Sequence, residues 1–202
     1  MKNALALSAA AVALLITSLP AHAAFVVDLT QEVIGGVPEV VANGGGTIDL
    51  TGLKFSVNTG EITAMVPFIS EITTGTSPAS VSNYTGVTGP ASFGSGGETL
   101  ASSSSGDHVG LLDDLGILAV PQGYVSGHAL SDSATYDNAT FASLGVTPGT
   151  YKWTWGTGDH ADSFTLQIGV PEPSTWAMML VGFGLVGFAA MRKGKREARL
   201  AV

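Results

Sequence analysis

Residues 151–168 read YKWTWGTGDHADSFTLQI, and this stretch decides the fold. Each of its two halves alternates apolar with polar residues, and the apolar positions are Tyr151, Trp153, Trp155, Phe164, Leu166 and Ile168. Alternation with a period of two is typical of a strand that has one buried and one exposed face. A polar loop at 156–161 joins the halves, so we expect an antiparallel hairpin whose aromatic residues anchor a core.

The chain before this hairpin has the same texture of short apolar runs separated by Gly, Asn, Pro and Ser, which indicates strands and turns. Strands are expected at 25–29, 33–41, 47–50, 53–57, 124–130 and 134–142. Residues 109–120 fit a strand or a short helix, although their glycines disfavour the helix. Pro67 allows only an edge or bulged strand, and 73–106 resembles a long loop with short strands. With no long amphipathic helix, residues 24–169 predict an all-β, jelly-roll-like β-sandwich.

The charge is distributed unevenly along the 202 residues. Between residues 24 and 170, fourteen acidic residues face only Lys54 and Lys152, which gives this part a net charge of −12. Nucleic-acid binding is excluded as a function because it requires Lys and Arg to replace phosphate counterions. The chain has no cysteine, so disulfides and thiolate metal sites are excluded as well.

The first 23 residues have the three parts of an export signal. Lys2 supplies a positive charge, 4–19 is apolar, and Pro20 precedes Ala21-His22-Ala23. Small residues at Ala21 and Ala23 form the A-x-A pattern that signal peptidase cleaves. We therefore expect residues 1–23 to be a signal peptide that signal peptidase removes after Ala23.

Residues 170–202 also consist of three parts in a fixed order. Pro171, Glu172 and Pro173 form a rigid polar motif, and an uncharged apolar run follows at 176–191. As a helix this run would be about 24 Å long, slightly short of a 30 Å hydrocarbon core. The run is followed by a basic stop made of Arg192, Lys193, Lys195 and Arg196. These parts predict one short transmembrane helix with the 24–169 domain outside and residues 192–202 in the cytoplasm.

No motif in the sequence predicts catalysis, a cofactor or a metal ion. There is no G-x-S-x-G and no H-E-x-x-H, and the G-x-G-x-x-G at 182–187 lies inside the apolar run rather than after a strand. His108, His128 and His160 have acidic neighbours only as chance would place them in a chain rich in Asp and Ser. Asp159 and Asp162 lack the spacing of a calcium loop.

Three aromatic residues are the candidate ligand-binding residues. Tyr151, Trp153 and Trp155 would form a platform for sugars if their shared face were exposed. Their alternation with polar neighbours favours the other interpretation, that they belong to the core.

The tail resembles the PEP-CTERM sorting signal of exported bacterial proteins. The resemblance rests on V-P-E-P at 170–173, then Ser174-Thr175-Trp176, the apolar run with its glycines, and Arg192-Lys193. It implies that an exosortase, a membrane-embedded processing enzyme, recognises Pro171, Glu172 and Pro173 while the helix holds the precursor transiently in the inner membrane. It also implies a Gram-negative host that makes exopolysaccharide. Residues 122–127 and 143–168 are similar to a recurrent cargo subtype of these proteins, a similarity that implies no catalytic residue.

These features lead to three hypotheses of function. The first is an exported, non-catalytic cell-surface or extracellular-matrix protein, associated with biofilm and with exopolysaccharide as a partner. Its precursor would hold the domain in the periplasm before transfer to the surface or the medium. The second is a carbohydrate-binding module or adhesin, which requires an exposed aromatic strip. The third is a secreted hydrolase, which requires one of the histidines beside an Asp and a Ser.

Overall fold

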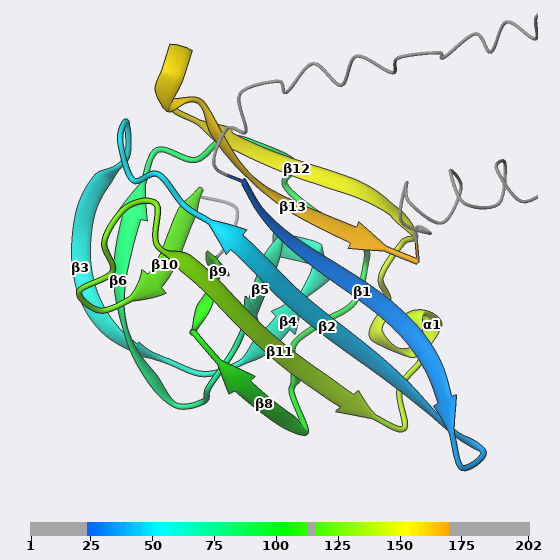
Figure 1. Ribbon diagram of the computed structural model, residues 1–202. Coiled ribbons are helices and arrows are strands. Elements are labelled where there is room, and N and C mark those ends of the chain that lie inside the picture. The colour runs from blue at the N-terminus through cyan, green and yellow to red at the C-terminus, as the bar shows by residue number, and fades with distance from the viewer. Residues whose placement is uncertain (1–23, 113–115, 170–202) are drawn as a thin grey trace, which may run out of the picture.

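The computed structural model describes residues 24–112 and 116–169, which form two β-sheets packed face to face (Figure 1). The predictions at 1–23 and 170–202 lie outside the described residues. These predictions are the signal peptide, the Pro-Glu-Pro motif, the membrane span and the basic stop. Within the described part of the chain, no helix is both long and apolar enough to cross a bilayer.

The first sheet contains both ends of the described chain. Its six strands, in spatial order, are β12 (Gly149–Trp155), β13 (Asp162–Ile168), β1 (Ala24–Ile34), β2 (Val37–Thr47), β11 (Ala129–Asp137) and β8 (Ser103–Gly106). Neighbours are antiparallel except β1 and β13, which run parallel with Leu29 opposite Ile168. The parallel pair joins the first and last strands through a long sequence separation, which no local turn could do.

The second sheet is antiparallel throughout. Its seven strands, in spatial order, are β3 (Lys54–Glu61), β6 (Ala79–Thr85), β10 (Ile117–Pro121), β9 (Val109–Leu112), β5 (Glu71–Thr74), β4 (Ala64–Val66) and β7 (Thr99–Leu100). The helical turns are η1 (Pro67–Ile69), α1 (Phe141–Leu144) and η2 (Gly158–His160). The edge strand β3 shifts register between Phe55 and Val57, and such a bulge is a common feature of exposed sheet edges.

The predicted hairpin is confirmed as β12 and β13. Trp153 lies opposite Phe164, their rings meet edge to face with centroids 6.0 Å apart, and Trp155 is buried beside them. Each indole N–H donates to a backbone carbonyl: Trp153 to Pro90 O at 3.0 Å and Trp155 to Asp49 O at 2.7 Å. Pairing the polar end of a buried tryptophan removes the main penalty of placing it in a core.

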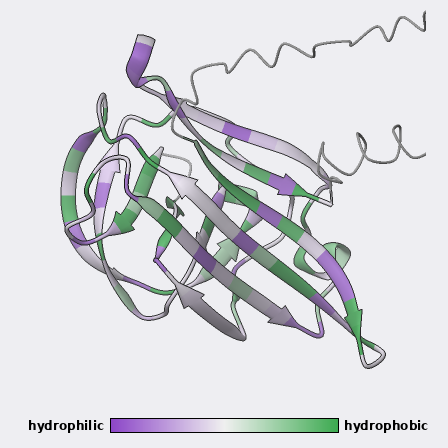
Figure 2. Cartoon of the chain, viewed as in Figure 1, coloured by the Kyte–Doolittle hydropathy of each residue, from purple (hydrophilic) through white to green (hydrophobic). Residues whose placement is uncertain are grey.

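The core lies between the two sheets, as the all-β sandwich prediction requires. It includes Phe25, Val27 and Leu29 from β1, which alternate with less buried neighbours as the sequence predicts. Figure 2 shows the same alternation of hydrophilic and hydrophobic residues along the strands. The parallel β1–β13 pair departs from a jelly roll, whose sheets are built from antiparallel Greek keys.

Several predicted strand boundaries were wrong. The expected strand at 33–41 is divided by a hairpin turn, because Gly35 and Gly36 adopt φ of 62° and 89°, which suits a tight two-residue turn; Val33 and Ile34 end β1, and 37–41 belong to β2. Residues 48–50 form a loop, and 124–128 are turns that precede β11. The expected strand at 134–142 ends at Asp137. α1 then begins after Thr140, whose side chain caps the helix by accepting from Ser143 N.

Three further expectations have clear outcomes. The described part of 109–120 forms the hairpin strands β9 and β10 rather than a helix. Pro67 lies in neither neighbouring strand and opens η1. The region 73–106 contains four strands or parts of strands, which is more order than the expected long loop.

β1 and β13 run in parallel from one end of the sandwich to the other, and the two ends differ in what they carry. At one end, Gly169 N donates to Leu29 O at 2.9 Å. We call this end the exit pole, since the described chain ends there at residue 169. The opposite end carries the loops 48–53, 124–128 and 156–161, and we call it the loop pole (Figure 1). The two strands of the predicted hairpin, β12 and β13, run between the two poles.

Candidate functional site

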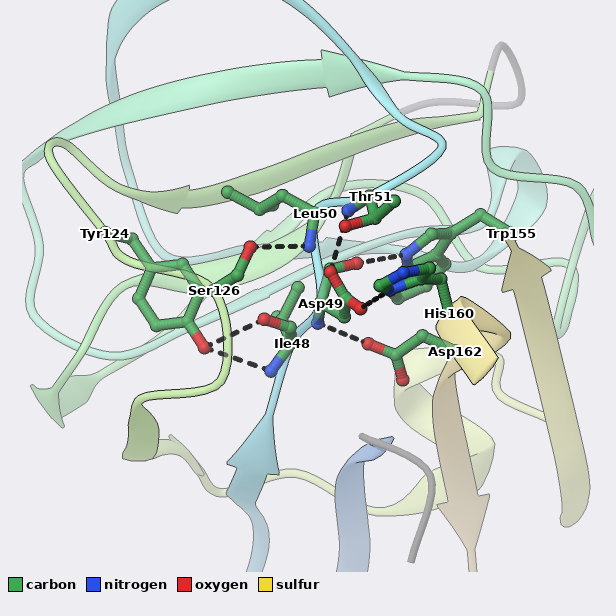
Figure 3. Close-up of polar contacts among 9 residues, drawn as sticks. All are labelled: Ile48, Asp49, Leu50, Thr51, Tyr124, Ser126, Trp155, His160 and Asp162. Atoms are coloured by element: carbon green, nitrogen blue, oxygen red, sulfur yellow. Dashed lines mark hydrogen bonds and ion pairs between the residues drawn. The ribbon is translucent and has the colours of Figure 1, made fainter. Parts of the chain in front are cut away.

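A cluster of polar contacts lies at the loop pole, around Asp49 (Figure 3). Asp49 follows β2, and its backbone N–H donates to Asp162 Oδ2 at 2.6 Å. Its carboxylate accepts from Thr51 N at 2.9 Å and lies 2.8 Å from His160 Nδ1. Its carbonyl accepts from the Trp155 indole. One residue thus ties the β2–β3 loop to both strands of the closing hairpin.

A second set of contacts holds the same backbone from the other side. The Tyr124 hydroxyl accepts from Ile48 N at 3.0 Å and lies 2.7 Å from His128 O. The Ser126 hydroxyl accepts from Leu50 N at 2.9 Å. Two side chains of the 124–128 loop therefore satisfy backbone N–H groups just after the end of β2, where no sheet partner is present.

The electrostatics at Asp49 favour its charged form. Hydrogen bonds from Thr51, followed by the contact with His160, lower the pKa of Asp49 to about 2. Hydrogen bonds to a carboxylate stabilise the ionised state, so this group stays negative across the physiological range. The His160 side chain is 59% exposed, and solvent screens this ion pair.

Two shallow hollows flank this cluster. One has a volume of about 280 Å³ and is lined by Thr51, Gly52, Gly156, Thr157 and His160. The other has about 330 Å³ and lies between Lys152 and Asp162, with Gly156 common to both. Both volumes are close to the lower end of the size range of small-molecule pockets, and no Trp, Tyr or Phe lines the first hollow. Among the described residues, these two hollows are open to solvent rather than enclosed.

The pair formed by His160 and Asp49 corresponds to two of the three members of a hydrolase triad, and the described residues supply no nucleophile to complete it. Ser126 accepts from the backbone and lies on the far side of residues 48–50 from His160 (Figure 3). Across residues 24–112 and 116–169, no serine hydroxyl makes a hydrogen bond to the His160 ring. Nucleophilic catalysis needs the nucleophile within hydrogen-bond reach of the base.

The other two histidines do not complete such an arrangement. His108 is buried, and its Nδ1 lies 2.9 Å from Thr76 O; burial lowers the pKa of this imidazole. His128 lies in a loop, and its backbone carbonyl accepts a hydrogen bond from the Tyr124 hydroxyl. Asp162 accepts from the amides of Asp49 and Ser163. In the described ranges, no three His, Cys, Asp or Glu side chains lie close enough to hold a metal ion.

The three candidate ligand residues do not form an exposed platform. Trp153 and Trp155 are 3% and 5% exposed, and Tyr151 is half-buried with its hydroxyl bonded to Thr147 O at 3.0 Å. The interpretation of these residues as core is confirmed for both tryptophans. This burial removes the aromatic strip on which the sugar-binding hypothesis depended.

Asp132, which no pattern in the sequence singles out, lies inside the sandwich. It sits on β11 in phase with the buried Leu130 and Ala134, and neither carboxylate oxygen has a hydrogen-bond partner. The nearby Thr74 hydroxyl donates to Val109 O instead. Burial, reinforced by the Asp107 carboxylate, raises the pKa of Asp132 to about 7. The facing residue is Gly44, where any Cβ would collide with this carboxylate.

The Asp49 pair should contribute little to stability. Replacing Asp49 by asparagine removes the charge, and we expect the free energy of unfolding at pH 6 to fall by less than about 1 kcal/mol, as is usual for exposed ion pairs. Because the pKa of Asp49 is lowered in the fold, its contribution exists above pH 3.8 and is lost as the pH falls toward 2.

The measurement is urea unfolding of wild-type and Asp49→Asn protein between pH 2 and 7. The two curves should converge at the acidic end. If the free energy of unfolding fell by several kcal/mol at pH 6, Asp49 would stabilise the fold far more than an exposed ion pair does. Asp159→Asn, on the neighbouring η2, serves as the matched control.

The described residues form an all-β domain of two sheets, and the chain continues beyond it into the tail that resembles a sorting signal. Residues 169–193 match the family model described as the PEP-CTERM protein-sorting motif. This match includes Pro171, Glu172 and Pro173 and extends through Lys193, so the chain carries the sorting motif that its tail predicts. The motif implies a secreted precursor that transits the membrane and an exosortase as its processing partner. No curated protein and no solved structure matches the chain.

Proposed function

We propose that this protein is a non-catalytic cell-surface or extracellular-matrix component, delivered by an exosortase and associated with exopolysaccharide or biofilm. The observation that carries the proposal is the sorting motif at residues 169–193. It starts at Gly169, one residue after β13 ends. The signal for sorting thus follows the folded domain directly, as it would in a protein whose domain is cargo.

The proposed route uses both ends of the chain. Signal peptidase removes residues 1–23 during export, and the apolar run at 176–191 then holds the precursor in the inner membrane with the domain in the periplasm. The exosortase acts near Pro171, and the cargo passes to the surface or the medium. The basic residues at 192–196 favour a cytoplasmic C-terminus for this precursor.

A non-catalytic role is supported by the chemistry of the domain. Among the residues that the structure describes, no serine hydroxyl is hydrogen-bonded to the His160–Asp49 pair, and the hollows next to the pair are shallow. A net charge of −12 between residues 24 and 170 supports solubility outside the cell and weak attraction of cations. These features suit a matrix component better than a hydrolase.

The alternative of a carbohydrate-binding module or adhesin has lost its main support. Sugar-binding sites usually stack a ring on an exposed aromatic face, and Trp153 and Trp155 pack in the core. The loop pole is the surface that would carry any such site, because it faces away from the membrane when the chain leaves at the exit pole.

The test is a change in the motif itself. Replacing Pro171, Glu172 and Pro173 by alanine should abolish recognition while leaving the apolar run and basic stop intact. In a host with a working exosortase, we expect the variant to accumulate at full length in the inner-membrane fraction. Thr175→Ala, outside the tripeptide, is the matched control and should reach the surface as the wild type does.

The fractions are compared by immunoblotting with an antibody against the 24–169 domain. Equal amounts of wild type and triple-alanine variant at the surface would contradict exosortase sorting through this motif.

A further inference from the structure

The tip of the β1–β2 hairpin is an exposed apolar surface at the exit pole. We define the hairpin tip as Val33, Ile34, Gly35, Gly36 and Val37. The three apolar side chains are 66%, 56% and 40% exposed, in a domain whose other large apolar residues mostly lie in the core. Figures 1 and 2 show this hairpin projecting past the rest of the sandwich, with hydrophobic residues at its end.

Both faces of the hairpin tip are apolar. Ile34 pairs with Val37 across the turn, and Val33 pairs with Pro38. Successive residues of a strand point to opposite faces, so these two pairs lie on opposite sides of the ribbon. A ribbon apolar on both sides cannot bury itself on one face of its own domain. Its form suits insertion into a surrounding apolar or amphipathic medium.

The position of the chain's exit relates this tip to the tail. Gly169 lies beside Leu29, and β1 continues five residues further to Ile34, which is about 17 Å at the rise of a strand. Six residues separate Gly169 from Trp176, where the apolar run starts. These seven Cα steps span about 22–24 Å when extended, as the two prolines favour.

The length of β1 beyond Leu29 is close to the extended length of the linker from Gly169 to Trp176. A linker extended along the direction of β13 would place Trp176 about 5–7 Å farther from the domain than the end of the hairpin tip. The headgroup region on each side of a bilayer is about 5–8 Å thick. The number of residues in the linker is therefore compatible with a hairpin tip at the depth of the headgroups.

We propose that, in the anchored precursor, the hairpin tip rests in the headgroup layer of the same membrane that residues 176–191 span. This inference depends on the proposed function, because it needs the tail to act as a membrane anchor. The contact orients the domain, with the exit pole against the membrane and the loop pole away from it. It ends when processing near Pro171 releases the tether.

The charges next to the tip limit how deeply it enters. Glu32 and Glu39 are cross-strand partners, two rungs behind the turn. Burying either carboxylate in hydrocarbon would be strongly unfavourable, so this rung stays in water or at the outer edge of the headgroups. Only the side chains of the tip itself reach the lipid, and anionic lipids should weaken the contact.

A fluorescence experiment on the full chain tests the proposal. The protein has no cysteine, so Val37→Cys at the tip and Thr157→Cys at the loop pole each provide one site for a bimane label. Both positions are exposed, and near-ultraviolet circular dichroism checks that each labelled chain is folded. The chains are reconstituted in phosphatidylcholine vesicles with or without brominated acyl chains.

We expect brominated lipid to quench the Val37 label at least about twofold more than the Thr157 label, because the bromine atoms lie within a few ångströms of the headgroups. Aqueous iodide should show the opposite order. An added Ile34→Asn substitution should reduce the lipid quenching at position 37.

Three results would overturn the proposal. A chain that does not co-float with the vesicles contradicts the membrane anchor, and the proposed function fails with it. A chain that floats with both labels equally open to iodide contradicts the tip contact alone. A Val37 label that is shielded from iodide but not quenched by bromine shows that the tip binds a second copy instead of lipid.

Discussion

Replacing Trp153 by alanine is expected to lower the free energy of unfolding of the 24–169 domain by about 3–5 kcal/mol. Trp153 is 3% exposed and packs edge to face on Phe164. The substitution leaves a cavity and removes the partner of the Pro90 carbonyl. The surroundings cannot easily close over this cavity, because the adjacent Gly89 has no side chain to move into it.

Urea unfolding followed by far-ultraviolet circular dichroism measures this loss. Lys152→Ala is the matched control, since Lys152 lies on the exposed face of the same strand and should change stability by no more than about 0.5 kcal/mol. Similar small effects at both positions would mean that β12 does not anchor the core.

Replacing Asp132 by asparagine should remove a large part of the pH dependence of stability. The pKa of Asp132 is about 7 in the fold against an ordinary value of 3.8. Between these values the folded protein keeps a proton that the unfolded chain has released. Stability therefore falls as the pH rises from about 4 to 7, by at most about 4 kcal/mol in total at about 1.4 kcal/mol per pH unit.

The neutral asparagine has no such titration. At pH 8 the Asp132→Asn domain should be more stable than the wild type by up to about 4 kcal/mol, and near pH 4 the two should be similar. Asp137→Asn, at the exposed end of the same strand, is the control. Parallel stability curves for wild type and Asp132→Asn from pH 4 to 8 would show that Asp132 is solvated.

The sequence predicted the parts of the fold that local patterns determine. Alternation of apolar and polar residues located β12 and β13 and correctly placed Trp153 and Trp155 in the core. It also located β1 at Phe25, Val27 and Leu29. One error came where a glycine turn interrupts an apolar segment, at Gly35 and Gly36, because apolar residues on both sides of the turn make two strands look like one.

Other features could not be predicted because they depend on contacts distant in sequence. The parallel pairing of β1 with β13 joins the two ends of the domain. Asp132 stands in a polar stretch, ALSDSAT, and nothing local shows that it faces Gly44 in the core. Asp49 gave one local signal, the D-x-T spacing to Thr51 that is typical of an Asx turn, but its partners His160 and Asp162 lie more than 100 residues away.

The central claim is that the tail is a processing signal and that the mature protein is the 24–169 domain with little beyond it. The most direct measurement is the intact mass of the protein extracted from the cell surface of a host with a working exosortase. We expect a chain that starts at Ala24 and ends near Pro171. A chain that ends at Val202 and remains in the inner membrane would contradict the claim.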